Sequence, residues 1–323
     1  MKNNKYGLMA CSRPLTNIGD FVQAIAAKQF LPHVDKYIDR EELNSYSGDD
    51  LKMIMNGWYM HNAKNWPPSV NIDPLYVSMH INASVAEGMT TEKSIAHFIK
   101  HQPIGCRDKT TERLLKSKGV DAYFSGCLTL TLGKTYKREK VTDDIYIVDP
   151  LFHYWSLKSM LKNPRKLLSR LTKGRFTEFI LKRNILKNNF SKEILDRAQM
   201  INQMMPLTSV DDSFIIADEY LKKLCNAKLV ITSRIHCALP CIAMGTPVVF
   251  LNGGFEGYNN QFTSRFEGLI DFFNRIDIDT KRNVTRNFDL KGKISLDNLP
   301  VNKELYKSFS EELAKKCDDF VAS

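Results

Sequence analysis

The stretch from Ile231 to Gly254, ITSRIHCALPCIAMGTPVVFLNGG, constrains the fold more than any other part of the sequence. A short apolar strand enters a polar turn, a helix follows, and a second apolar strand begins after Gly245 and Pro247. Two strands joined by a helix in this way lie parallel in one sheet. Because the same alternation recurs along the chain, we predict an α/β protein of two Rossmann-like domains that face a central cleft.

The expected elements divide the chain into four parts. Residues 1–150 form a first Rossmann-like domain, closed by a strand at Ile145–Val148, and residues 151–195 form a basic helical insertion. Residues 196–300 form the second Rossmann-like domain, and 301–323 a C-terminal helix. Ligands of such sheets bind at the carboxyl ends of the strands, so functional residues are expected there. The remaining expected elements are strands at Tyr6–Met9, Leu51–Met55, Leu75–His80, Val120–Phe124, Gln203–Thr208, Lys228–Thr232 and Pro247–Leu251, and helices at Asp20–Lys28, Thr91–Lys100, Lys109–Ser117, Lys192–Gln203, Asp212–Asn226, Arg234–Met244 and Asn302–Val321.

Composition and residue spacing exclude several classes of protein. Hydrophobic residues make up 43% of the chain, enough for well-formed cores, yet no apolar run is long enough to span a membrane. The first residues have too little apolar length for a secretory signal, so we predict a cytoplasmic protein. The seven cysteines never occur as C-x-x-C, which favours free thiols over disulfides or a zinc site. His97 and His101 share a helix face without an evident third ligand, so no metal is expected.

The net charge of +10 is concentrated in one segment. Between Trp155 and Phe190, ten lysines and arginines stand against one acid, Glu178. Apolar residues at helical spacing predict two amphipathic helices there, interrupted near Lys173 and Gly174. Such helices either lie on an anionic membrane surface or pack onto the protein and leave a solvated face. Nucleic-acid-binding motifs are missing, so no nucleic-acid partner is expected.

The turn after the strand at Lys228–Thr232 carries a candidate anion site. We expect Ser233 to cap the next helix, which places Arg234 and His236 in its first turn, where backbone N–H groups are unpaired. A helix N-terminus, a guanidinium and an imidazole together favour an anion. Pro240 removes a helical hydrogen bond, so an irregular turn is expected there. Alternatively, Arg234 only pairs with an acid and His236 is an interior histidine.

A second cationic turn is expected between a strand and a helix in the first domain. Arg107 and Asp108 stand directly ahead of that helix, and Ser125 with Gly126 follows the next strand. Because both positions lie at carboxyl ends of strands, they are candidates for the same binding site. Arg107 either contacts a ligand or pairs with Asp108 at the start of the helix.

Two further loops could contribute to a binding site. Asn17, Gly19 and Asp20 open the first long helix, where the glycine permits close approach of a ligand to the backbone. Asp20 either caps the helix or binds a sugar hydroxyl. Trp58 and Trp66 occur in a proline-bearing aromatic stretch that either lines a carbohydrate-sized pocket or plugs the end of the sheet. The dinucleotide-binding pattern G-x-G-x-x-G is absent.

Together these motifs resemble the polysaccharide pyruvyl transferases, over roughly Tyr6 to Leu251. The matching elements, in order along the chain, are Asn17–Asp20, Gly105–Asp108, Ser125–Cys127, Ser233–His236 and Gly245–Val248. The resemblance implies a fold similar to that of GT-B glycosyltransferases. It also implies an enzyme that moves a pyruvyl group from phosphoenolpyruvate onto a sugar of a cell-surface polysaccharide such as a capsule or exopolysaccharide. The product is often a ketal that bridges two hydroxyls, and the acceptor is frequently lipid-linked.

The resemblance gives the candidate residues their roles. Arg234 and Arg107 would hold the phosphate and carboxylate of phosphoenolpyruvate, His236 would act as acid or base, and Asp20 would orient or deprotonate the acceptor. The second domain would bind the donor and the first domain the acceptor, with no cofactor and no metal. The basic stretch 155–190 would hold the enzyme at the inner face of the plasma membrane, and an oligomer is possible. The other expected substrate-binding residues are Ser233, Asn17, Gly19, Ser125, Gly126, Trp58, Trp66 and Asn252.

Two other functions fit the same residues. A GT-B glycosyltransferase could bind the diphosphate of a nucleotide sugar at the turn that carries Arg234 and His236. Glu256 would then bind the ribose. Alternatively, the chain is a non-catalytic, membrane-associated protein of glycan assembly.

Overall fold

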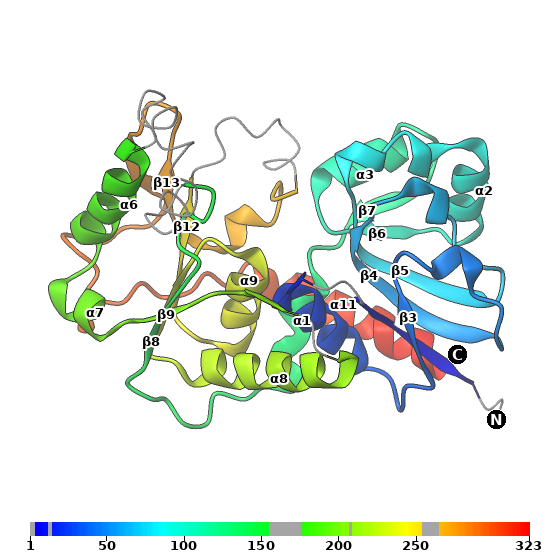
Figure 1. The fold of residues 1–323 in the computed structure, drawn as a ribbon, viewed down its shortest axis with the longest axis horizontal. Coiled ribbons are helices and arrows are strands. Elements are labelled where there is room, and N and C mark those ends of the chain that lie inside the picture. The colour runs from blue at the N-terminus through cyan, green and yellow to red at the C-terminus, as the bar shows by residue number, and fades with distance from the viewer. Residues whose placement is uncertain (1–3, 12–14, 155–175, 207–208, 254–264) are drawn as a thin grey trace.

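The computed structural model describes residues 4–11, 15–154, 176–206, 209–253 and 265–323 (Figure 1). Two six-stranded sheets lie at opposite sides of the molecule, with helices gathered between them. The first sheet is parallel throughout and has the strand order β3 (Lys36–Asp39), β1 (Tyr6–Ala10), β4 (Leu51–Tyr59), β5 (Ile72–Ile81), β6 (Ile104–Cys106), β7 (Ala122–Phe124).

The second sheet is parallel except at one edge, where β14 runs antiparallel to β13. Its strand order is β14 (Val284–Arg286), β13 (Asn274–Ile278), β12 (Val248–Asn252), β11 (Leu229–Thr232), β8 (Ile145–Val148), β9 (Gln199–Ile201). These two mostly parallel sheets confirm the α/β class. The arrangement of two Rossmann-like domains as in GT-B enzymes stays a prediction.

The helices complete the two halves. The α-helices are α1 (Ile18–Lys28), α2 (Glu92–Lys100), α3 (Lys109–Lys116), α6 (Phe176–Asn189), α7 (Lys192–Arg197), α8 (Val210–Asn226), α9 (Ile235–Met244) and α11 (Tyr306–Ala322). Short 3-10 segments are η1 (Leu43–Ser45), η2 (Ala63–Asn65), η3 (Ala83–Val85), η4 (Gly88–Thr90), η5 (Leu128–Lys134) and η7 (Ile270–Phe272).

Two expectations about the elements are wrong. The strand Ile145–Val148 does not close the first sheet, because as β8 it pairs with β11 and β9 of the second sheet. A single helix over Lys192–Gln203 is also wrong: α7 ends at Arg197, and the backbone turns extended at Ala198 before β9. The first error arises because apolar spacing does not tell which neighbour a strand will pair with. The second is an error of helix boundary, which sequence patterns predict least well.

The start of α9 also differs from the prediction. Ser233 is not the helix cap; Arg234 occupies that position and makes no side-chain capping bond. Ser233 instead joins three strand ends, since its hydroxyl donates to Leu251 O at 2.6 Å and accepts from Leu151 N at 2.8 Å. Pro240 does not break α9, which runs through it to a left-handed Gly245 with φ of +79°.

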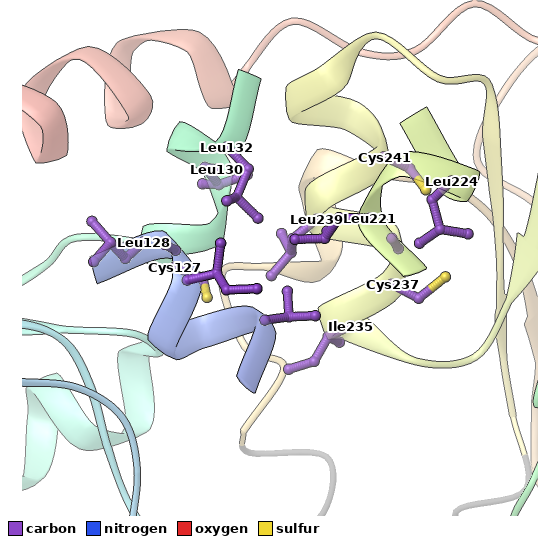
Figure 2. Close-up of a cluster of buried hydrophobic side chains, with 14 of the residues drawn as sticks. Cys127, Leu128, Leu130, Leu132, Leu221, Leu224, Ile235, Cys237, Leu239 and Cys241 are labelled. Carbon is purple, nitrogen blue, oxygen red and sulfur yellow. The ribbon is translucent and has the colours of Figure 1, made fainter. Parts of the chain in front are cut away.

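One hydrophobic core joins the two halves (Figure 2). On one side lie Leu128, Leu130 and Leu132 of η5, and on the other Leu221 of α8 and Leu239 of α9. Each of these leucines is at most 1% exposed, and α1 packs into the same cluster. Since a fully buried leucine contributes roughly 1.5–3 kcal/mol, this cluster holds the two sheets in a fixed relation.

Two further contacts cross between the halves. The short β2 (Leu15–Asn17) pairs antiparallel with β10 (Met204–Pro206), which links the loop before α1 to the second half of the chain. Helix α11 returns to the first sheet, where Lys52 Nζ donates to Phe320 O at 2.9 Å and Tyr6 Oη to Val321 O at 3.2 Å. The β2–β10 pair lies just beyond the carboxyl ends of β1 and β9, whereas the contacts of α11 lie at the amino ends of β1 and β4.

Candidate functional site

His236 lies where the two halves of the chain meet. It is the second residue of α9 and is 9% exposed. A Cβ built on Gly19 of α1 would lie 3.0 Å from His236 Cβ and 3.1 Å from its Nδ1. The structure therefore brings the Asn17–Asp20 loop against the Ser233–His236 turn. His236 Nε2 is buried and has no hydrogen-bond partner among the described residues.

Arg107 extends from the end of β6 toward the same place. It is 1% exposed, and its backbone N–H donates to Met79 O at 2.8 Å. Its Nη1 donates to Gln23 Oε1 of α1 at 3.4 Å, while its Nε finds no partner in the described part of the chain. Burial lowers the pKa of Arg107, and Asp108 and Asp20 raise it through their charge. An arginine held this deep with unused donors is suited to bind an anion.

Arg234 pairs with an acid, Asp149. That Arg234 also binds an anion stays a prediction. Arg234 Nε donates to Asp149 Oδ2 at 2.9 Å, and its guanidinium lies 3.7 Å from the ring centre of Phe152. Asp149 Oδ2 also accepts from Gln203 N at 3.0 Å, and Gln203 O accepts from Ile18 N at 2.9 Å. This chain of contacts connects Arg234 to the first residue of α1.

A third arginine, Arg265, belongs to the same group and was missed in the sequence. Burial, and then repulsion by Arg107 and Arg234, lowers the pKa of Arg265 to about 9, while Asp20 and Asp108 oppose this. No recognisable motif surrounds Arg265, so only the folded chain reveals it.

Burial and three nearby arginines keep His236 uncharged. Burial lowers its pKa well below the usual 6.5, and Arg107, Arg265, His80 and Arg234 lower it further through repulsion. His236 is therefore neutral at pH 7 in the unbound protein. A group of cations that repels a proton also attracts an anion.

His80 of β5 is the second histidine at this place, and the sequence motifs did not single it out. Its Nδ1 lies 2.6 Å from Asp108 Oδ2. Burial, and then Arg107, lowers the pKa of His80 to about 4, while Asp108 raises it. The expected Arg107–Asp108 ion pair is thus replaced in part by a His80–Asp108 hydrogen bond.

The side chain of Arg40 contacts both Asp20 and Trp58. Arg40 Nη1 lies 3.7 Å from Asp20 Oδ1, and its guanidinium stacks 4.7 Å from the Trp58 ring centre. With Gly57 they line a pocket of about 20 Å³, which is large enough for one water but not for a sugar ring. Trp66 lies elsewhere, buried against Tyr59, Tyr76 and Phe98 in the core of the first sheet.

The remaining predicted residues make structural bonds. Ser125 Oγ donates to Cys106 O at 3.0 Å and accepts from Ser78 N at 3.0 Å. Asn17 Oδ1 caps α1 by accepting from Gly19 N at 3.1 Å. Asn252 Nδ2 donates to Asp277 Oδ1 at 2.6 Å, and Gly126 takes a φ of +71° that favours glycine.

A comparison with known families shows which family the chain belongs to. The model of the family described as polysaccharide pyruvyl transferase matches residues 17–254. The chain belongs to the polysaccharide pyruvyl transferase family. It is therefore a transferase enzyme, and its matched region contains Arg107, Arg234 and His236.

Other comparisons add less. No curated protein matches the chain. A solved structure of a functionally uncharacterised protein from Klebsiella pneumoniae subsp. pneumoniae NTUH-K2044 is similar, at 14% identity and a TM-score of 0.44, over 81% of this chain and 87% of that one. A likeness this low supports no conclusion about function.

The described residues contain neither a cluster of metal-ligating side chains nor a membrane-spanning helix. No three histidine, cysteine, aspartate or glutamate side chains there come together as a metal site would require. Within the same part of the chain, no helix combines the length and apolar character needed to cross a bilayer.

Proposed function

We propose that this family member transfers pyruvate from phosphoenolpyruvate onto a pair of sugar hydroxyls of a cell-surface polysaccharide precursor, forming a ketal. The observation that carries the proposal is that Arg107, Arg234 and Arg265 all lie near enough to the buried His236 to lower its pKa. Phosphoenolpyruvate brings a phosphate and a carboxylate, so it matches several guanidinium groups at once.

Donor binding would change the protonation of His236. The anionic donor offsets the charge of Arg107, Arg234 and Arg265, which otherwise lowers the pKa of His236. His236 then takes up a proton and delivers it to the methylene carbon of the donor. The central carbon gains oxocarbenium character, a sugar hydroxyl adds to it, phosphate leaves, and a second hydroxyl closes the ketal.

The acceptor would approach from the first domain, past Asp20 and Trp58. Since their pocket is too small for a sugar, Arg40 must move or the sugar must lie outside it. Asp20 would orient the acceptor hydroxyl.

We also propose that the acceptor is lipid-linked and that the basic stretch 155–190 contacts the inner face of the plasma membrane. Residues 155–175 lie outside the described part of the structure. In α6, the side chains of Leu181, Ile185 and Leu186 pack into the hydrophobic core of the second sheet. They are therefore not available to a bilayer. Lys187 and Arg183 remain exposed on α6 for an anionic surface.

Ligand-dependent melting separates this proposal from its closest rival. Phosphoenolpyruvate should raise the melting temperature, and Arg234→Ala should abolish the shift while UDP-, GDP- and CMP-sugars have no effect. A shift with nucleotide sugars alone would favour a glycosyltransferase, for which Glu256, outside the described residues, was the expected ribose ligand.

The third possibility is a non-catalytic assembly protein. If His236→Ala left glycan pyruvylation in cells unchanged and deletion of residues 157–186 abolished it, that possibility would replace the proposal.

A further inference from the structure

His80 and Asp108 form a buried pair to which the proposed function gives no role. His80 stands on β5 beside Trp58 of β4 and is 4% exposed, and Asp108 is fully buried at the N-terminus of α3. Their Nδ1 and Oδ2 atoms are 2.6 Å apart. The pair directly adjoins Arg107, which precedes Asp108 in the chain.

The hydrogen bonds of Asp108 determine which ring nitrogen of His80 carries the proton. Asp108 Oδ1 accepts from Thr111 N at 2.9 Å and from Thr111 Oγ1 at 3.0 Å. Burial would raise the pKa of Asp108, but His80, Arg107 and these hydrogen bonds hold it below its usual value. An ionised carboxylate only accepts hydrogen bonds, so His80 Nδ1 must carry the proton and donate it to Oδ2.

This tautomer leaves a lone pair on His80 Nε2. The hydrogen bonds of His80 to other described residues all involve Nδ1, with Asp108 and at 3.5 Å with Thr111 Oγ1. Nε2 is therefore open to accept a hydrogen bond from a ligand. An imidazole oriented by a carboxylate in this way is the arrangement of a general base.

His80 also belongs to the same electrostatic group as His236. Arg107 and Arg265 repel protons from both histidines, and His80 contributes to the lowered pKa of His236. His80 comes from the first sheet and His236 from the helix after β11 of the second sheet. A donor held by these arginines would therefore have one imidazole from each half of the protein.

The reaction needs two groups that handle protons, and this inference rests on the proposed function. Two sugar O–H bonds break and two C–O bonds form at the central carbon of phosphoenolpyruvate, while its C–O bond to phosphate breaks. One proton ends on the former methylene carbon and the other on the departing phosphate. We propose that His80, oriented by Asp108, is a further catalytic residue whose Nε2 accepts the proton of the attacking sugar hydroxyl. It then returns that proton to the departing phosphate. His236 protonates the methylene carbon and regains a proton from the second hydroxyl as the ketal closes.

A purely structural role is the alternative, in which the pair only joins β5 to the start of α3. His80→Asn distinguishes the two, because its amide nitrogen replaces Nδ1 as donor to Asp108 but no atom replaces Nε2. The catalytic role predicts that kcat falls about 10²–10⁴-fold while the Kd for phosphoenolpyruvate stays within about twofold. The acidic limb of the pH profile of kcat should also disappear.

The assay follows phosphate release from phosphoenolpyruvate with a panel of p-nitrophenyl hexosides as acceptors, and calorimetry gives the Kd. His97→Asn is the matched control, since burial also lowers the pKa of His97 to about 4 but its Nε2 faces Tyr76 Oη at 2.7 Å. That control should retain the wild-type kcat. In His80→Gly, added imidazole should restore part of the activity.

The outcomes separate the two proposals. If the wild-type protein reacts and His80→Asn is equally fast, or if its kcat and donor affinity fall together without rescue by imidazole, the role of His80 is wrong and the proposed function stands. If the wild-type protein neither binds phosphoenolpyruvate nor releases phosphate from it, the proposed function fails, and the role of His80 with it.

Discussion

Gly19 lies against His236 so closely that the smallest side chain on Gly19 would reach the imidazole, 3.0 Å from Cβ and 3.1 Å from Nδ1. The contact joins the first turn of α1 to the first turn of α9. It places side by side a loop and a turn that are more than two hundred residues apart in the sequence.

Gly19→Ala should therefore impair catalysis more than stability. Alanine is preferred over glycine in a helix by roughly 1 kcal/mol, which offsets part of the cost of displacing His236. We expect phosphate release from phosphoenolpyruvate to fall at least about tenfold, since small displacements of a catalytic group are costly. The melting temperature should change little. Wild-type activity in this variant would show that the contact does not position His236.

Ser233→Ala should lower the stability of the fold. The hydroxyl of Ser233 accepts from Leu151 N and donates to Leu251 O, so its loss leaves two buried backbone groups unpaired. We expect the free energy of unfolding to fall by about 1–3 kcal/mol in urea titrations. Ser45→Ala, which removes a hydroxyl from an exposed bond to Glu42 O, should change it by less than about 0.5 kcal/mol. Equal effects would contradict the role given to Ser233.

Donor binding should be linked to proton uptake. The unbound protein holds His236 neutral because burial and three arginines lower its pKa, and an anion beside those arginines reverses part of that repulsion. Calorimetry of phosphoenolpyruvate binding in buffers of different ionisation enthalpy should give a positive proton uptake at pH 7. His236→Gln should reduce the number of protons taken up on binding. Uptake of the same size in this variant would assign the proton elsewhere.

Acid should destabilise the fold in a defined window. Burial lowers the pKa of His80, His97 and His153 to about 4, below the 6.5 of the unfolded chain. The unfolded state then binds more protons, so stability is present above pH 6.5 and declines as the pH falls toward 4. His97→Gln should make the decline of the unfolding free energy between these values shallower. An unchanged slope would show that His97 is not held neutral by the fold.

The sequence motifs predicted that Arg107, Arg234 and His236 would lie near one another, because all three follow apolar strands at positions where ligands of parallel sheets bind. The structure brings them close together, and their role in binding stays a prediction. The motifs did not predict Arg265 or the His80–Asp108 pair, since these residues gain their roles from three-dimensional neighbours. The same limit led β8 to be placed in the wrong sheet, because its pairing with β11 depends on residues about eighty positions away. The residue type of Ser233 favours a helix cap, but its hydroxyl instead bonds the backbone of Leu151 and Leu251.

Transfer of labelled pyruvate tests the central claim most directly. Phosphoenolpyruvate labelled with ¹³C at its central carbon would be incubated with the full-length protein and the p-nitrophenyl hexosides, with phosphate measured in parallel. We predict that the label appears in a ketal carbon bonded to two sugar oxygens, with one phosphate released for each ketal formed. Label that stays in phosphoenolpyruvate, while a nucleotide sugar yields a glycoside of the same acceptor, would contradict the account.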